Sequence, residues 1–191
     1  MSSRMTTRDR RGRREGPTVR IARATARDAK RLTTMVRRSR AYEGGYASMV
    51  AGYRVGPDYI EAHSVHIAIG EDDALLGFYA LLLDPPELDL MFVADRAQGL
   101  GVGRQLITHM ITEARSAGLA AVRVVSHPPA EGFYRSVGAQ RTGTVAAQPS
   151  VVNWDRPELM FHLDRLDEAA PPRPASRRGV RGEQLPAPHI G

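Results

Sequence analysis

The sequence lacks cysteine, and among its 27 basic residues it has only one lysine, Lys30. The missing cysteine excludes disulfides, a cysteine nucleophile and cysteine-ligated zinc. The six histidines show no HExxH or similar spacing, so we expect no metal site. A length of 191 residues suits one domain, and 42% hydrophobic residues suffice for a packed core.

Long hydrophobic runs are also missing. The longest apolar run covers residues 74–83, far short of the roughly 20 residues that a membrane-spanning helix needs. The basic N-terminus is not followed by an apolar stretch, so no signal peptide is predicted. We therefore expect a cytoplasmic protein with no membrane partner.

The net charge of +6 lies mostly near the ends of the chain. Residues 1–17 carry six bases and two acids (+4), residues 167–191 carry four and three (+1), and residues 18–166 carry 17 and 16 (+1). Both end segments have little apolar content, so we predict two disordered tails around one domain at 18–166. Basic tails can bind nucleic acid or remain solvated, and with a near-neutral domain we expect no nucleic-acid partner.

Hydrophobic periodicity and turn residues predict an α/β mixture. Thr25 and Asp28 form a potential capping box at the start of the first helix, and Gly118 suits the end of the longest one. The expected helices cover 25–40, 46–53, a turn after Pro57, 103–117 and 130–137. The expected strands cover 19–22, 65–69, 75–83, 88–93, 121–126, 141–147 and 159–163.

A glycine-rich loop joins the strand at 88–93 to the longest helix. Its alternate glycines allow close approach of a ligand, and the helix start offers free amides and a positive dipole end. This favours a pyrophosphate site, with a ligand-free turn as the alternative. The loop fits neither a Walker A motif, which needs a lysine, nor a Rossmann fingerprint, which needs a third glycine at Arg104. The candidate binding residues are Gln98, Gly99, Leu100, Gly101, Val102, Gly103 and Arg104.

Two motifs in order resemble those of the GNAT superfamily. Gln98-x-x-Gly101-x-Gly103 is similar to its Q/R-x-x-G-x-G/A signature, residues 87–93 resemble its fourth strand, and residues 130–139 resemble its A-x-x-F-Y-x-x-x-G-F motif. The resemblance covers about 18–166. It implies a mixed, mostly antiparallel sheet with two splayed parallel strands, flanked by helices, and binding of acetyl-CoA. Ala139 departs from the pattern, as does His127, which stands where relatives often have Asn.

The resemblance also implies roles in acyl transfer, which needs a polarised thioester carbonyl and a protonated leaving thiolate. Backbone amides near Met91 or Phe92 would polarise the carbonyl, and Val93 would contact the cofactor. Tyr134 matches the tyrosine of the second motif and would protonate the thiolate, since a phenol has a pKa near 10. His127 would contact the pantetheine arm. Packing of the adjacent aromatic rings is the alternative for Tyr134.

The general base is expected at Glu87 or Asp89, which lie two apart on one strand and should share a face. Both could instead simply follow the Pro85-Pro86 turn in solvent. His66 and His127 are further candidates, because an imidazole titrates in the right range. The acceptor pocket is expected at residues that could equally be core, namely Tyr42, Tyr46, Tyr53 and the loop 148–157 with Trp154.

These observations predict an N-acetyltransferase that moves an acetyl group from acetyl-CoA to a primary amine of a small molecule, by direct attack in a ternary complex. A homodimer is compatible with the sequence. The alternatives are aminoacyl transfer from tRNA and a CoA-binding module without turnover. Residues 20–40 hold eight bases and one acid, Asp28, which could attract an acidic acceptor or form a solvated face.

Overall fold

The computed structural model describes residues 18–46, 50, 52–149 and 152–164. The predicted tails at 1–17 and 167–191, and part of the helix expected at 46–53, lie outside the described residues. Within the described part of the chain, no helix is both long and apolar enough to cross a membrane.

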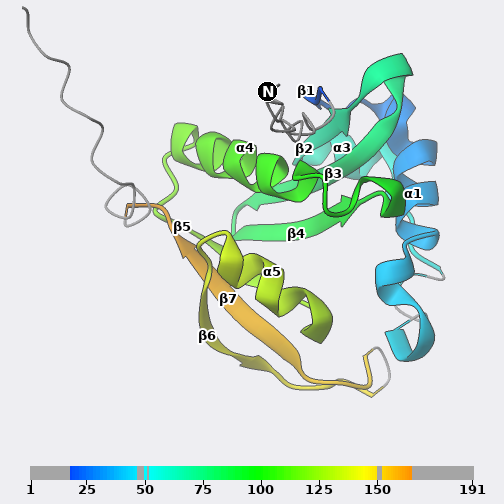
Figure 1. Cartoon of the computed structure of the whole chain (residues 1–191). Helices are drawn as coiled ribbons and strands as arrows, with labels where there is room; N and C mark the ends of the chain where they lie inside the picture. The colour runs from blue at the N-terminus through cyan, green and yellow to red at the C-terminus, as the bar shows by residue number, and fades with distance from the viewer. Residues whose placement is uncertain (1–17, 47–49, 51, 150–151, 165–191) are drawn as a thin grey trace, which may run out of the picture.

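Seven strands form one sheet in the order β1-β2-β3-β4-β5-β7-β6 (Figure 1). All neighbours are antiparallel except β4 and β5, which run parallel. This confirms the predicted α/β fold class, with a mostly antiparallel sheet and one parallel pair. The strands are β1 Arg20–Arg23, β2 Ser64–Ile69, β3 Leu75–Leu83, β4 Pro86–Val93, β5 Ala121–Val125, β6 Gln140–Val145 and β7 Arg156–His162.

The helices are α1 Ala29–Arg37, α3 Pro57–Ala62, α4 Val102–Ser116 and α5 Glu131–Ser136, with short 3-10 turns at Ala26–Asp28, Arg40–Tyr42, Gly44–Tyr46, Glu71–Asp73, Asp95–Ala97 and Pro128–Ala130. The predicted capping box of Thr25 and Asp28 is present. The first helix ends at Arg37, earlier than the predicted 40, because Ser39 adopts an extended conformation with ψ of 120°.

The sheet separates two hydrophobic clusters. On one face, α4 contributes Leu106, Ile107 and Met110, which lie in a cluster with Tyr79 and Phe161. On the other face, α1 and α3 cover a second cluster that contains Leu32, Val36, Ile60, Phe78 and Phe92. We call these the α4 face and the α1/α3 face.

A β-bulge in β4 shifts the alternation of its side chains between the two faces of the sheet. Ala80 pairs with Leu90 and Leu81 pairs with Leu88, which leaves Asp89 as an extra residue between them. Leu88 accordingly packs on the α4 face, whereas Leu90 packs on the α1/α3 face. Since side chains alternate along a strand, Glu87 points away from Leu88, toward the α1/α3 face.

Candidate functional site

Strands β4 and β5 separate soon after they meet. Their parallel register contains one pair, Glu87 with Arg123, although both strands are fully described and β4 continues to Val93. Beyond that pair the two strands diverge toward their carboxyl ends. The result is the splay that the resemblance implied, with an unpaired edge of β4 facing it.

Backbone direction along β4 decides which amides face the splay. The amide of Ala94 donates a hydrogen bond to the carbonyl of Leu76, on the β3 side, over 2.8 Å. Amides alternate in direction along a strand, so Phe92 also faces β3, and Met91 and Val93 face the splay. The prediction placed the carbonyl-polarising amide at Met91 or Phe92, and the geometry favours Met91.

The three loop glycines differ in their surroundings. Gly99 and Gly101 have φ of +75° and +82°, and a Cβ built at either would meet no atom within 4 Å. A Cβ at Gly103 would instead lie 3.1 Å from the Phe133 ring and 3.5 Å from the Met91 methyl. Gly99 and Gly101 therefore permit a left-handed backbone beside open space. The absence of a side chain at Gly103 lets α4 pack closely against Phe133 of α5 and Met91 of β4, while its amide still belongs to the open first turn of the helix.

The start of α4 presents free amides. Its first intrahelical hydrogen bond runs from the Gln105 amide to the Gly101 carbonyl over 3.1 Å, so the amides of Val102, Gly103 and Arg104 precede the hydrogen-bonded ladder. They point out of the helix end, where the dipole of a 15-residue helix adds positive potential. This arrangement suits a phosphate or pyrophosphate group.

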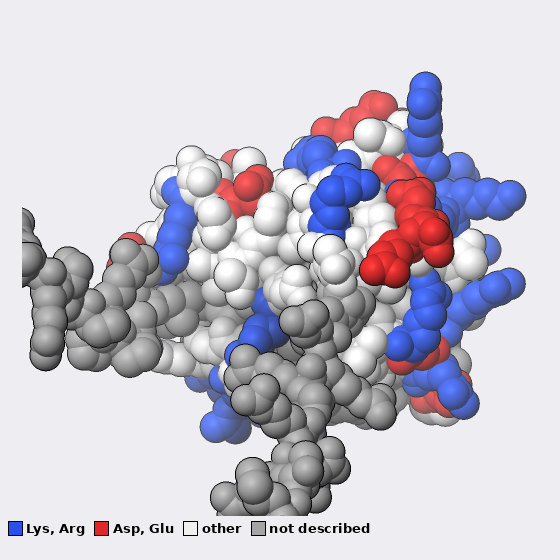
Figure 2. Space-filling model, turned by 45° about the horizontal axis from the view of Figure 1, so that its top comes forward, with Lys and Arg blue, Asp and Glu red and all other residues white. Residues whose placement is uncertain are grey.

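A basic cavity of about 790 Å³ lies between α1 and the end of β4. Figure 2 shows Lys and Arg side chains gathered at the end of the molecule where α1 lies in Figure 1, with acidic groups among them. The basic stretch at 20–40 is therefore partly the wall of a hollow rather than only a solvated face. The charged lining residues are Arg27, Lys30, Arg31, Arg38, Asp95 and Arg96.

Tyr134 lies in α5 and is 8% exposed. It belongs to the hydrophobic cluster on the α4 face, and its ring meets that of Phe133 edge-on at 5.4 Å. Phe133 lies next to Gly103 and Met91. The structure thus brings the second motif against the glycine loop and β4, as a shared site requires.

The two predicted carboxylates have different partners. Glu87 accepts a hydrogen bond from Arg123 over 2.8 Å, and Arg123 also donates to Glu158 over 2.6 Å. Asp89 accepts a hydrogen bond from the Tyr59 hydroxyl. We call these five residues the carboxylate cluster. Three acids and one guanidinium give it a net negative charge on the α1/α3 face.

The carboxylate cluster also shifts the pKa values of its own members. Burial raises the pKa of Tyr59 well above its usual range, and Asp89 raises it further, so the phenol stays protonated as a donor. The hydrogen bond to Glu158 raises the pKa of Arg123, burial opposes this shift, and Glu87 reinforces it. Tyr59, Arg123 and Glu158 were not among the predicted site residues. The sequence signal that could have found Arg123 and Glu158 is that each is a charged residue between two apolar neighbours, on β5 and on β7.

Aromatic residues from three separate segments form a wall near the end of β5. The rings of Tyr46 and Trp154 meet edge-on at 4.5 Å, and Tyr46 also meets His127 at 5.9 Å. The indole nitrogen of Trp154 is buried, with no hydrogen-bond partner among the described residues. Burial lowers the pKa of His127, against the effect of the Ala41 carbonyl. The structure thus brings Tyr46 and Trp154 of the expected acceptor pocket together, whereas Tyr53 packs against the cluster on the α1/α3 face and the side chain of Tyr42 is not described.

His66 does not join these residues. It is 7% exposed and stacks on Tyr79 at 5.2 Å, on the α4 face of the sheet. Burial, and the nearby His109, lower the pKa of His66 to about 4. His66 therefore lies on the wrong face to serve as the alternative base beside Glu87 and Asp89.

Comparisons with known proteins agree on one family. Residues 55–148 match the profile described as Acetyltransferase (GNAT) domain. A curated relative, the peptidyl-lysine N-acetyltransferase YjaB of Salmonella typhimurium, is 29% identical over 86 residues, which cover 45% of this chain and 57% of that protein. The aligned part thus spans little more than half of the curated relative.

Solved structures share the fold. A GCN5-related N-acetyltransferase from Rhodopseudomonas palustris aligns with a TM-score of 0.60 at 17% identity, covering 77% of this chain and 96% of the other. The acetyltransferase yncA of Salmonella typhimurium, solved with acetyl-CoA, aligns with a TM-score of 0.59 at 20% identity, covering 83% and 99%. At these identities the likeness establishes the architecture alone.

Proposed function

Because residues 55–148 place this chain in the GNAT acetyltransferase family, we propose that it transfers an acetyl group from acetyl-CoA to a primary amine. The observation that carries the proposal is the combination of a β4–β5 splay with a glycine loop at the start of α4. The splay supplies an unpaired backbone edge and the loop supplies an anion site, and the two are continuous along the chain.

The loop residues fit the pyrophosphate of acetyl-CoA. The left-handed backbone of Gly99 and Gly101 borders open space, and the amides of Val102, Gly103 and Arg104 point out of the helix end. Bound there, acetyl-CoA would supply an activated thioester. The edge of β4 at Met91 and Val93 would hold its pantetheine arm in the splay, near His127 at the end of β5.

The chain's own groups can then stabilise each charge that develops. The Met91 amide, which faces the splay, donates to the carbonyl oxygen as the amine nitrogen attacks the carbonyl carbon. Tyr134 donates its phenolic proton as the carbon–sulfur bond breaks, which leaves neutral CoA thiol, and the phenolate regains a proton through solvent as the attacking nitrogen loses its second proton and becomes the amide. The neighbouring residue Phe133 lies beside Gly103, and Tyr134 itself belongs to the buried cluster that α4 covers, which supports this role.

Asp89 is the proposed base that takes the proton of the acceptor ammonium. It lies two residues from Met91, about 7 Å along the strand, whereas Glu87 is four residues and about 13 Å away. Glu87 is moreover held by Arg123 at the closed end of the splay. At such a distance Asp89 would act through a bridging water, with the Tyr59 hydroxyl fixing its orientation.

The acceptor is proposed to be a small primary amine that enters from the α1/α3 face. The net negative charge of the carboxylate cluster favours an ammonium group there, and Tyr46 and Trp154 offer an apolar wall. A lysine side chain carries the same ammonium, and the name of the curated relative makes lysine peptides the second candidate.

A transfer assay tests the proposal. The full-length chain is incubated with acetyl-CoA and one acceptor at a time, taken from a panel of small amines and lysine-containing peptides, and the products are identified by mass spectrometry. A parallel set of reactions replaces acetyl-CoA with aminoacyl-tRNA. Acetylated amine is expected with small amines. Activity with peptides alone would reassign the acceptor to lysine. If acetyl-CoA binds but no acceptor of the panel is acetylated, the result would favour a CoA-binding module without turnover. If product forms from aminoacyl-tRNA instead, the assignment of acetyl-CoA as the donor is wrong.

A further inference from the structure

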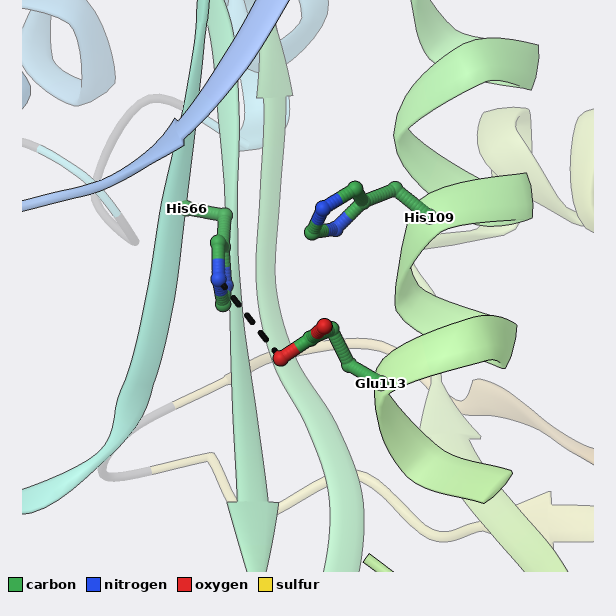
Figure 3. Close-up of side chains that lie close together, drawn as sticks. All are labelled: His66, His109 and Glu113. Carbon is green, nitrogen blue, oxygen red and sulfur yellow. Dashed lines mark ion pairs between the residues drawn. The ribbon is translucent and has the colours of Figure 1, made fainter. Parts of the chain in front are cut away.

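Three metal-ligating side chains converge on the α4 face, away from the proposed acetyl-transfer site. One ring nitrogen each of His66 and His109 and a carboxylate oxygen of Glu113 all lie within 4.8 Å of one another. Figure 3 shows the three side chains pointing into the space between β2 and α4. The closest pair is His66 Nε2 with a Glu113 oxygen, at 3.7 Å.

The nitrogens of both rings are oriented in a way that suits metal ligation. The His109 Nδ1 atom is hydrogen bonded to the Tyr79 hydroxyl at 2.9 Å, which leaves Nε2 of that ring as a ligand atom. A histidine that binds metal typically has its second nitrogen held by such an oxygen. The His66 ring is buried and directs its Nε2 toward the Glu113 carboxylate oxygen at 3.7 Å, which makes Nε2 the ligand atom of this ring.

The spacing fits a tetrahedral ion after a small closure. Ligands about 2.1 Å from zinc at tetrahedral angles lie about 3.4 Å apart. The 3.7 Å separation between His66 Nε2 and the Glu113 oxygen is already close to that value. The other two separations are at most 4.8 Å, and side-chain rotations that move the ligand atoms by about an ångström would close them. His109 and Glu113 stand four residues apart, on one side of α4, so only His66 comes from another element.

We propose that His66, His109 and Glu113 bind one zinc-class divalent ion, with a fourth coordination position left for water. Two imidazoles and one carboxylate suit zinc and its neighbours, whereas Mg²⁺ and Ca²⁺ prefer oxygen ligands alone. The ion would join β2 to α4, the helix whose first turn carries the glycine loop. This site revises the expectation of no metal, which rested on motif spacing in the sequence alone.

A cavity gives the ion a route to the site. It has a volume of about 640 Å³ and runs along α4 from Gly101 past Gln105 and Thr108 to Thr112, with His109 in its lining. The fourth coordination position can therefore be reached from solvent along this side of the helix. The lining includes the Gln105 amide and the hydroxyls of Thr108 and Thr112, which can contact a hydrated ion, together with the Arg104 guanidinium and the apolar side chain of Ile21.

The test uses the full-length chain, stripped with a chelator and then titrated with Zn²⁺ alone against a chromophoric competitor. One Zn²⁺ per chain is expected, with a rise in the thermal midpoint. His109→Gln and Glu113→Gln should each weaken Zn²⁺ binding at least about tenfold, and Tyr79→Phe by about 10- to 100-fold through loss of the oxygen that orients His109. His162→Gln and His189→Gln serve as controls and should keep wild-type affinity.

His66→Gln is avoided as the main variant because a buried substitution could disturb folding, whereas His109 and Glu113 are only half-buried. X-ray absorption of the zinc-loaded protein should show two imidazole ligands. The proposal fails if the folded wild-type chain binds no stoichiometric Zn²⁺, or if His109→Gln and Glu113→Gln both keep its affinity. Loss of binding in His189→Gln would place the ion on the C-terminal segment instead. These outcomes do not depend on acetyl transfer.

Discussion

The glycine loop and the carboxylate cluster lie at opposite ends of β4 and are built in different ways. The loop is one contiguous segment whose backbone amides face the space proposed for the pyrophosphate. The carboxylate cluster draws side chains from α3, β4, β5 and β7, namely Tyr59, Glu87, Asp89, Arg123 and Glu158. A backbone site depends on conformation, and a side-chain site depends on charge. Substitutions at the two places should therefore fail in different ways.

The largest effect is expected at the loop. Gly101→Val places a branched side chain at a φ of +82°, beside the space proposed for the pyrophosphate. Calorimetry should show loss of measurable acetyl-CoA binding in a folded protein. The left-handed strain itself should cost about 1–3 kcal/mol of stability.

Gly118→Val is the matched control for that change. Gly118 lies just beyond the other end of α4, has a φ of +76° and also borders open space. It should lose similar stability while keeping acetyl-CoA affinity. Equal loss of affinity in both variants would mean that strain, not intrusion on a ligand, explains the effect.

The next largest effect is expected at Tyr134, where the substitution removes a single hydroxyl group. Tyr134→Phe keeps the buried ring and removes the proton donor, so turnover should fall by about 10- to 10⁴-fold. Acetyl-CoA affinity and the unfolding midpoint should change little. If presteady-state measurements show a wild-type rate for the chemical step, Tyr134 is a packing residue of its cluster.

The smallest effect is expected within the carboxylate cluster, and it should depend on pH. An acceptor amine with a pKa near 9 or 10 is mostly protonated at neutral pH, so Asp89→Asn should slow turnover by roughly 10²-fold at low pH. The deficit should shrink as pH rises, because bulk deprotonation then supplies free amine. The measurement is the pH–rate profile with a fixed small amine.

Glu87→Gln separates the two carboxylates. It removes a charge that is already held by Arg123, so its profile should keep the wild-type shape with a smaller loss. A profile that recovers with pH in Glu87→Gln but not in Asp89→Asn would make Glu87 the base. That result would also contradict the distance argument drawn from β4.

The fold could be predicted because its signals are local. The capping residues Thr25 and Asp28, the apolar run of β3 and the glycines after α4 and α5 each act within a few residues. The end of α1 at Arg37 was missed because the nearest glycine in the sequence is Gly44. The bulge at Asp89 could not be predicted, because it follows from the pairing of β4 with β3. The same bulge sets which side chains of β4 share a face.

For the site residues, too, what could be predicted depends on whether the signal is local in the sequence. The candidate loop at 98–104 could be recognised, because an anion site made of backbone amides depends on consecutive residues, here glycines followed by the start of a helix. Arg123 and Glu158 were missed, since they meet Glu87 only across three strands. His109 and Glu113 did carry a signal, two ligands one helical turn apart, but the third ligand lies 43 positions before His109, on β2.

The central claim is that the β4 edge and the first turn of α4 hold acetyl-CoA together. An amide-resolved NMR titration with acetyl-CoA tests it most directly. The largest shifts are predicted at the amides of Met91, Val93, Val102, Gly103 and Arg104, with small shifts along β1 and β6. Large shifts confined to the basic cavity beside α1, with those five amides unmoved, would contradict the account.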